Sequence, residues 1–338
     1  MPSARRRSVS DFALTGTGVA ATEAPSRAKV LARLHFGDKA FRLITRSAAI
    51  LVLLLLGGVI ISLVIGSLPA LQAFGLDFVT TQSWNPVTEK FGALAPIYGT
   101  IVTSIIAMVI AVPIGLMIAY FLTELAPQWL RRPIGIAIEL LAGIPSIIYG
   151  IWGLFVFAPF LQQYVQPALI ATFGNIPLLS NVFAGPPYGI GILTASLILV
   201  IMILPFIVAI TRDVFETVPP VLRESAYGLG CTTWEVIRSV VLPYTRVGVI
   251  GGIMLALGRA LGETMAVTFV IGNAHRISTS LLAPGTTISA TIANEFAESD
   301  GLHQSGLILL GLLLFVLTFF VLAAARLMLM RLEKKAGN

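Results

Sequence analysis

The sequence predicts an all-α polytopic membrane protein with six transmembrane helices. Hydrophobic residues make up 57% of its 338 residues and charged residues 11%, whereas soluble domains carry about 25% charged residues. Six apolar runs are each long enough to cross a hydrocarbon core of about 30 Å, which takes about 20 helical residues. The basic residues gather in alternate connections between these runs. These three observations together exclude a soluble domain.

The six runs are continuous and rich in Leu, Ile, Ala and Gly, whereas a transmembrane β-barrel needs alternating segments of about ten residues. We therefore expect a helical transmembrane domain over residues 46–330, with an N-terminal tail over 1–45 and a C-terminal tail over 331–338. The expected spans lie near residues 47–68, 98–122, 134–160, 189–211, 247–272 and 305–328.

The orientation follows from the basic residues, because those near the ends of spans are retained on the cytoplasmic side. Nine lysines and arginines precede the first span and four lie at or beyond the end of the last, while the connections 123–133 and 212–246 carry two and four. The three other connections share only Lys90 and Arg276. Both termini are therefore predicted to be cytoplasmic. This topology accounts for the net charge of +6 without a nucleic-acid partner.

Several remaining features carry no predicted chemistry. The basic tail over 1–45 is rich in Ser, Thr, Ala and Arg and is predicted to be mostly disordered. Its charged leader is too long for a cleavable signal peptide. Cys231 is the only cysteine, so no intrachain disulfide is possible. The three histidines, at positions 35, 275 and 303, are too scattered in the sequence to suggest a metal site.

The chain lacks the sequence motifs of a nucleotide-binding site and of two common classes of hydrolase. It contains no G-x-x-x-x-G-K-[ST] loop for nucleotide phosphates, no G-x-S-x-G elbow and no H-E-x-x-H helix. We therefore predict a transport subunit without enzymatic activity or a bound cofactor. If ATP drives transport, its hydrolysis belongs to a partner chain, which needs a docking surface on the cytoplasmic side.

The connection 212–246 is the longest predicted cytoplasmic segment and favours a helix, a glycine turn and a second helix. Two prolines at 219–220 suit a helix start, and Gly228 with Gly230 suits its end. Thr232 and Glu235 form a possible capping box for the second helix, "WEVIRSVV", which we expect Pro243 to stop. A DNA-binding helix-turn-helix is the alternative, but a segment tethered to the bilayer at both ends cannot easily reach a major groove. Docking to a partner protein is the favoured interpretation.

The same connection resembles a known motif. It matches the E-A-A, three residues, G, nine residues, I-x-L-P loop of prokaryotic ABC importer permeases through Glu224, Ser225, Ala226, Gly230, Val240, Leu242 and Pro243. The stretches "WNPVTEKFGALAPIYGT", "ELLAGIPSIIYGIWGLFVFAP", "LGRALGETMAVTFVIGNA" and "LLAPGTTISATIANEF" resemble the PstC-type permease subunits of phosphate-specific ABC importers. The resemblance runs from about residue 38 to the C-terminus.

This resemblance implies a type I ABC importer permease fold in a prokaryotic plasma membrane. It implies a homologous second permease of the PstA type, an ATPase dimer of the PstB type that binds ATP and Mg, and a phosphate-binding protein of the PstS type. It also implies that the loop residues couple the spans to the ATPase; these are Glu224, Ser225, Ala226, Gly230, Leu242 and Pro243. Sulfate, molybdate or another oxyanion remains an alternative substrate.

Two charges in the fifth span are the main candidates for the substrate pathway. Arg259 lies near the middle of the span, where an arginine costs about 2.5–3.5 kcal/mol on insertion scales, so it must face protein or water. Glu263 follows one helical turn later, and we expect the two side chains to meet on one helix face. Either they form a structural pair, or Arg259 offers a guanidinium fork to an oxyanion. A third alternative is a secondary transporter or channel in which the pair relays protons.

In the oxyanion interpretation, Glu263 accepts a hydrogen bond from the hydroxyl that phosphate retains and sulfate lacks.

Weaker candidates lie in the third span and in the last outer connection. We expect Glu139 to pair with Arg131 or Arg132, with a role in the pathway as the alternative. Ser146 follows Gly143 and Pro145, which are predicted to break this span and to line a cavity or gate. The outer segment 278–299 is apolar enough to be partly buried or re-entrant, and it is the predicted contact for the protein that delivers the substrate.

Overall fold

The computed structural model describes residues 27–174, 176–177 and 179–336, and within them it forms helices joined by turns, with one isolated β-bridge between Asn85 and Lys90. Six helices are long and apolar enough to cross a membrane, which confirms the predicted number of spans. They cover Asp38–Phe74, Leu94–Leu125, Ser146–Phe173, Ile192–Glu216, Thr233–Gly262 and Gly301–Arg331.

Several of these long helices contain short wide turns of π-helix, labelled η1 to η4, and one 3₁₀ turn, η5, precedes the last helix. In chain order the elements are α1 (Arg27–Phe74), α2 (Asp77–Thr80), α3 (Leu94–Tyr120), η1 (Phe121–Leu125), α4 (Gln128–Ala142), α5 (Ser146–Trp152), η2 (Gly153–Phe157), α6 (Ala158–Phe160), η3 (Leu161–Val165), α7 (Gln166–Phe173), α8 (Ile192–Glu216), α9 (Pro220–Gly228), α10 (Thr233–Val236), η4 (Ile237–Val241), α11 (Leu242–Gly262), α12 (Met265–Thr268), α13 (Ile288–Glu295), η5 (Phe296–Glu298) and α14 (Gly301–Ala336).

The chain divides into two compact units, residues 1–59 and residues 60–338. In the first unit, α1 begins at Arg27, within the stretch 1–45 that the sequence predicts as a mostly disordered tail. Residues 27–45 are rich in Ala, Leu, Lys and Arg, which have high helix propensity. Residues 1–26 lie outside the described part of the chain. The large apolar side chains of residues 41–59 are exposed, as is typical of a helix surface that faces lipid.

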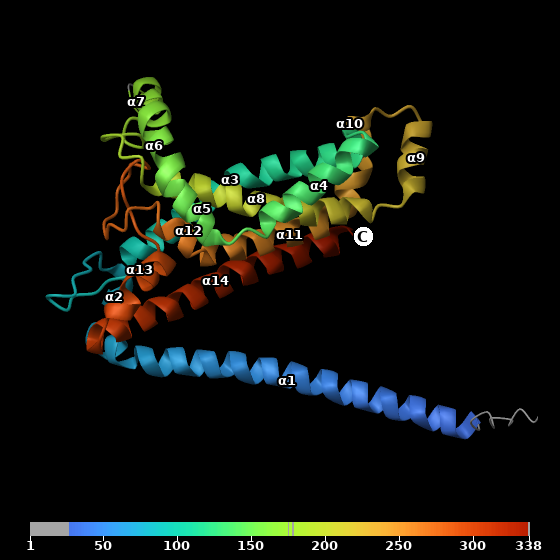
Figure 1. Ribbon diagram of the computed structural model, residues 1–338, viewed down its shortest axis with the longest axis horizontal. Helices are drawn as coiled ribbons and strands as arrows, with labels where there is room; N and C mark the ends of the chain where they lie inside the picture. The colour runs from blue at the N-terminus through green and yellow to red at the C-terminus, as the bar shows by residue number, and fades with distance from the viewer. Residues whose placement is uncertain (1–26, 175, 178, 337–338) are drawn as a thin grey trace, which may run out of the picture. The chain divides into compact units, whose positions relative to one another are not determined.

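The second unit is built around α8, the most enclosed of the six membrane helices. Of its 18-residue apolar segment, 67% is buried. Helices α3, α4 and α11 pack along it, as Figure 1 shows. Glycines bring the helix axes close together. A methyl group added at Gly115 of α3 would lie 2.7 Å from a side-chain carbon of Ile207, and one at Gly252 of α11 would lie 2.6 Å from Ile210. Such contacts between small residues are the usual source of helix association in lipid.

The third span differs from its predicted position. The sequence predicts a helix over 134–160, but α4 ends at Ala142 and a separate helix begins at Ser146. The predicted break is therefore confirmed, although it lies between two helices and not inside one span. Pro145 disfavours helical geometry in the residue before it, which accounts for the break. Because α4 carries three charges, the apolar crossing moves to Ser146–Phe173.

The fifth span also differs from its prediction. It starts at Thr233 and ends at Gly262, whereas the sequence predicts 247–272. Pro243 does not stop the second loop helix, which runs without a break from α10 through η4 into α11. The wide π-helical turn just before Pro243 removes the need for the amide hydrogen that proline lacks. The second loop helix is therefore the beginning of the fifth span.

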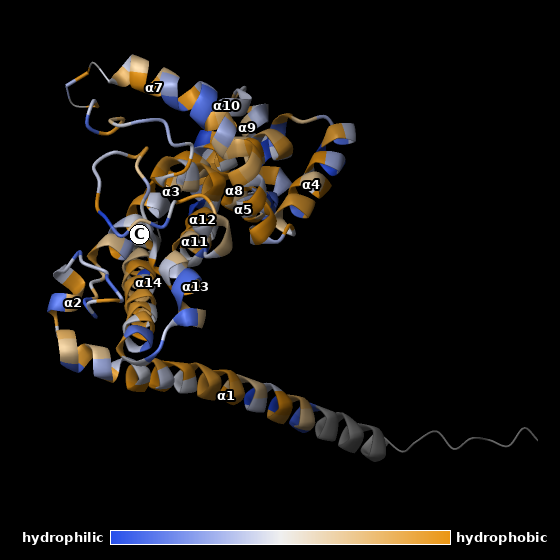
Figure 2. Ribbon diagram, turned by 60° about the vertical axis from the view of Figure 1, so that its left-hand side comes forward, coloured by the Kyte–Doolittle hydropathy of each residue, from blue (hydrophilic) through white to orange (hydrophobic). Residues whose placement is uncertain are grey.

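The two ends of this unit differ in the segments that they carry. Helices α9 and α10 lie at the same end as the C-terminal part of α14, while α2, α7 and α13 lie at the opposite end (Figure 1). Figure 2 shows hydrophobic residues along α8 and α14 between the two ends. This arrangement agrees with the predicted alternation of the connections. The assignment of the α9 end to the cytoplasm remains a prediction from charge.

Neighbouring glycines of α11 allow a test of this packing. Gly252→Val is expected to destabilise the protein by about 1–3 kcal/mol because the new side chain must displace Ile210. The matched change Gly251→Val projects into open space and is expected to cost less than about 0.5 kcal/mol. Thermal unfolding of the two purified variants in one detergent measures the difference. Equal losses of stability would contradict the close approach of α11 and α8.

Candidate functional site

Arg259 is exposed on the last full turn of α11, within the fifth span. In the part of the chain that the structure describes it makes no ion pair, and its guanidinium carbon lies 5.9 Å from the ring centre of Phe206 on α8. An aromatic face stabilises a cation but does not neutralise it. Because a charge in hydrocarbon is costly, the open side of Arg259 must face a partner protein or water.

The predicted meeting of Arg259 and Glu263 is not seen. The described residues form no ion pair between them, because α11 ends at Gly262 and Glu263 has an extended backbone. The one-turn spacing therefore does not place the two side chains on one helix face. Glu263 instead accepts a hydrogen bond of 3.2 Å from the amide of Ala266, in the first turn of α12. Its carboxylate helps to start the next helix.

Two broken helices lie next to each other here, since α5 packs against α12. A methyl group added at Gly150 of α5 would lie 2.9 Å from the carbonyl oxygen of Met265, so only glycine allows this approach. The hydroxyl of Tyr149 donates to the carbonyl of Leu141 over 2.9 Å and satisfies a carbonyl near the end of α4. Ser146 is half-buried at the start of α5. Discontinuous helices are the usual setting of substrate sites in transporters.

The sequence predicts that Glu139 pairs with Arg131 or Arg132, but the structure shows neither pair among the residues that it describes. Its carboxylate accepts a hydrogen bond of 2.9 Å from the guanidinium of Arg212, which lies on α8. The expected neighbours are on the first turns of α4 itself, but the amphipathic face of α4 packs on α8 and brings its charge to the other helix. Glu139 thus joins α4 to α8, and nothing in its contacts indicates a place in the substrate pathway.

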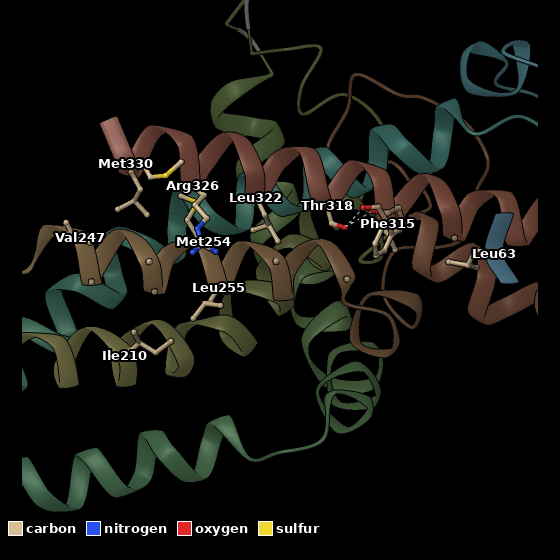
Figure 3. Close-up of a pocket in the computed structure, with 18 residues that line it drawn as sticks. Leu63, Ile210, Val247, Met254, Leu255, Phe315, Thr318, Leu322, Arg326 and Met330 are labelled. Atoms are coloured by element: carbon tan, nitrogen blue, oxygen red, sulfur yellow. Dashed lines mark hydrogen bonds between the residues drawn. The ribbon is translucent and has the colours of Figure 1, made fainter. Parts of the chain in front are cut away.

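A groove of about 1300 Å³ lies between α11 and α14, as Figure 3 shows. Its walls are mostly apolar, with Leu255, Leu322 and Phe315 among them, and Arg326 lies toward one end. Gly258 and Gly262, which flank Arg259, line it as well. Arg259 and Glu263 are not among its lining residues. The groove is therefore an apolar recess beside the charged residues and not a site built around them.

The first half of the predicted cytoplasmic loop has the expected architecture, a short helix followed by a glycine turn. Pro220 starts α9, and Gly230 has a φ of 87°, a backbone conformation that favours glycine. Thr232 and Glu235 form the predicted capping box. Ala226 is buried in the core between α9 and the membrane helices, where Cys231 packs against the same cluster.

The other side of the loop is open. Glu224 and Ser225 are exposed on α9. The side chains of Leu229 and Trp234 are 85% and 60% exposed, so this side of the loop presents large apolar groups as well as polar ones. Leu242 is half-buried and Pro243 is exposed where the fifth span continues from the loop. The predicted loop residues therefore lie in one region, with Ala226 facing inward and the others partly or wholly outward.

Sequence reasoning missed a cluster at the opposite end. Glu295 of α13 accepts hydrogen bonds from Trp84 and His303 on one oxygen, at 2.8 Å each, and contacts His275 at 3.0 Å on the other. The two imidazoles stack on aromatic rings, His275 on Trp84 and His303 on Phe91. These histidines are 28 positions apart, so only the folded chain reveals that they share a carboxylate.

Burial alone would raise the pKa of Glu295, but the hydrogen bonds from His275, Trp84 and His303 outweigh it and lower the pKa below its ordinary value of 4.5. The predicted burial of the 278–299 segment is also confirmed, since residues 285–291 are all buried. The surface left for a delivering protein is therefore mainly residues 293–298.

The lowered pKa gives a pH-dependent prediction. A carboxyl group whose pKa is lowered by folding stabilises the protein above its unfolded-state pKa, and this contribution is lost as the pH falls through the folded-state pKa. Glu295→Gln is expected to lower the unfolding temperature at pH 7.5, where the carboxylate is ionised, and to have a smaller effect below pH about 4. Protonated histidines keep their donors, so the contacts persist until the carboxyl group itself is neutralised.

Thermal unfolding of the native chain and of Glu295→Gln across this pH range checks the prediction. Glu298→Gln, an exposed neighbour in η5, is the control and should show no such trend. A stability difference for Glu295→Gln that does not change with pH would contradict the role of the ionised carboxylate.

Six membrane helices, two adjacent helix breaks and a separate loop helix at one end define a membrane transport subunit. The chain belongs to the family of binding-protein-dependent transport system inner membrane components, whose sequence profile matches residues 111–334. This result and the solved structures described below confirm the predicted ABC importer permease fold.

The chain is similar to several curated relatives over most of its length. It is 69% identical to the phosphate transport system permease protein PstC of Mesorhizobium japonicum, over 92% of this chain and 96% of the relative. It is 59% identical to the protein of the same name from Pasteurella multocida, over 90% and 95%. A probable PstC of Methanocaldococcus jannaschii is 38% identical over 80% and 88%.

Two solved structures share the fold at low sequence identity. A bacterial alginate ABC transporter, in complex with a pentasaccharide-bound periplasmic protein, contains a chain that aligns with a TM-score of 0.54, 19% identity and coverage of 79% of this chain and 87% of that one. A chain of an inward-facing MetNI methionine ABC transporter aligns with a TM-score of 0.51 and 18% identity, and the alignment covers 71% of this chain and 94% of that one. At these identities the likeness shows the fold alone.

Proposed function

We propose that this chain is the permease subunit of an ATP-driven importer that moves inorganic phosphate from a substrate-binding protein into the cytoplasm. The substrate assignment is supported by relatives named as phosphate transport permeases at 59–69% identity over nine tenths of the chain. The membrane is the plasma membrane of a prokaryote, and both termini are cytoplasmic. The chain itself has no enzymatic role.

The observation that carries this proposal is the open guanidinium of Arg259 near the end of the fifth span, whereas the sequence predicts a position near the middle. Without an ion-pair partner among the described residues, it is available to an anion. A guanidinium group is planar and always charged, and its donors match two oxygens of a phosphate. We assign Arg259 to the substrate pathway, with Glu263 and the start of α5 at Ser146 as neighbouring pathway elements.

A second permease of the PstA type is the proposed partner for the groove between α11 and α14. Methyl groups added at Gly251 and Gly262 meet no atom within 4 Å, so another helix can approach α11 closely there. A partner at this groove would lie beside Arg259 and would exclude lipid from it. The pathway would then run between the two permeases.

The remaining partners are assigned by the two ends of the molecule. The exposed face of α9, with Glu224 and Leu229, is the proposed contact for an ATPase dimer of the PstB type, which binds ATP and Mg. An exposed helix face with apolar residues and one acidic residue suits insertion into a cleft of another protein. The opposite end, with α13, is the proposed contact for a phosphate-binding protein of the PstS type.

Labelled phosphate uptake tests the function. Cells that lack their own high-affinity system receive the cognate partners with either the native chain or Arg259→Gln, at matched membrane levels. The native chain is expected to restore uptake, and the variant to reduce it at least about tenfold, because it loses a charged hydrogen-bonding group worth about 1.5–3 kcal/mol.

The outcomes separate the candidate functions. Uptake of sulfate or molybdate but not of phosphate by the native chain would move the assignment to another oxyanion. Uptake without a co-purifying ATPase would favour a secondary transporter. Equal uptake by the two chains would remove Arg259 from the pathway.

Selectivity provides a separate test of Glu263. The Gln side chain of Glu263→Gln keeps an oxygen that can accept from the amide of Ala266, so α12 is preserved while the charge is lost. If the carboxylate recognises the phosphate hydroxyl, the ratio of sulfate to phosphate uptake is expected to rise about tenfold or more. Competition between the two labelled anions measures it. An unchanged ratio at normal protein abundance would assign Glu263 to capping alone.

A further inference from the structure

Arg223 of the loop helix α9 contacts two different membrane helices. One terminal nitrogen of its guanidinium group donates to the carbonyl oxygen of Phe215, in the last turn of α8, over 2.6 Å. The other terminal nitrogen lies 3.0 Å from a carboxylate oxygen of Glu124, in η1 at the end of the second span. A single planar side chain therefore ties α9 to the ends of the second and the fourth spans.

The ion pair is well shielded from solvent. The side chain of Glu124 is only 7% exposed and that of Arg223 only 21%. Charges that are shielded in this way interact more strongly than exposed ones, and each is costly to leave unpaired. The ion pairs of Arg212, in contrast, involve acidic partners that are more than half exposed. The pair between Arg223 and Glu124 is therefore better shielded from solvent than the ion pairs of Arg212, and removal of either partner leaves a shielded charge unpaired.

Few other features hold the position of α9. The helix has nine residues and is joined to its neighbours by short segments, one with Pro219 at its start and one with Gly230. Ala226 packs in the core, but an alanine has no polar group and no direction-specific contact. Residues Val221, Leu222, Glu224, Ser225, Tyr227 and Leu229 are exposed. Apolar packing alone would allow a short helix of this kind to slide or roll.

We propose that the Arg223–Glu124 ion pair is the link that transmits movement of α9 to the second span. Arg223 and Glu124 are positioning residues, since neither reaches the pathway. Displacement of α9 pulls on η1, which packs against α3, α4 and α8 and passes the movement to them. Glu124 lies in a π-helical turn, and such turns are frequent at functional sites. The inference rests on the proposed function, because it requires an ATPase that moves α9.

The test measures phosphate taken up per ATP hydrolysed. The native chain, its cognate second permease, the ATPase and the binding protein are reconstituted in liposomes. Glu124→Gln and Arg223→Gln are compared with the exchanged pair Glu124→Arg/Arg223→Glu. The exposed Glu216→Gln, which loses only a 4.0 Å contact with Arg212, is the matched control.

We expect the uptake per ATP to fall about tenfold in each single variant and to stay at the native value in the control. The exchanged pair is expected to recover to within about threefold of the native ratio, because it restores the attraction but not the hydrogen bond to Phe215. A purely structural role would lower the amount of complex and reduce uptake and hydrolysis together. An unchanged ratio in assembled single variants therefore overturns the proposal.

One further variant and one further measurement cover complexes that do not assemble or do not transport phosphate. If the Gln variants do not assemble, Arg223→Lys keeps the charge but lacks the fork that reaches both partners. Its uptake per ATP is expected to fall about threefold, and a native ratio overturns the proposal. If the native chain assembles with an ATPase but moves no phosphate, the proposed substrate fails. The link between α9 and the spans is then overturned only if ATP hydrolysis in Glu124→Gln still responds to the binding protein as in the native complex.

Discussion

The close packing of α8 against its neighbours is the contact on which the second unit of this protein depends. Lipid tails are as apolar as leucine, so helices in a membrane are not driven together by the hydrophobic effect and need close contact between small residues. Glycines of α3 and α11 provide it along α8. The same helix then positions the charged groups at one end. Arg212 holds Glu139 of α4, and the carbonyl of Phe215 receives Arg223 of α9.

The cost of polar groups in hydrocarbon explains where the helices are interrupted. Backbone amides and carbonyls freed by a break need partners from the protein, and here they find them locally. The Tyr149 hydroxyl satisfies Leu141 at one break, and the Glu263 carboxylate satisfies Ala266 at the other. Both breaks lie where α5 meets α12. Arg259 is close in sequence to the second break, and its guanidinium forms no ion pair among the described residues.

The number of spans, the helix break before Ser146, the glycine turn at Gly230 and the capping box could be predicted from the sequence, because each depends on neighbouring residues. Contacts between distant residues could not. The spacing of Arg259 and Glu263 predicts a pair only if the helix continues, and hydropathy does not reveal that it ends at Gly262. The partner of Glu139 depends on which face of α4 packs on α8. Of the two histidines on Glu295, His275 lies in a loop and His303 in the first turn of α14, and no local pattern connects them.

The continuity of the fifth span has a geometric consequence for the loop. Thr233 and Arg259 belong to one helix, and at 1.5 Å per residue they are about 40 Å apart along its axis. A π-helical turn holds one residue more than an α-helical turn needs, and each residue of an α-helix rotates the chain by about 100°. Removing one residue from Ile237–Val241 would therefore turn α10 by roughly that angle relative to Arg259. The number of residues in the single turn Ile237–Val241 therefore sets the direction in which α10 faces relative to Arg259.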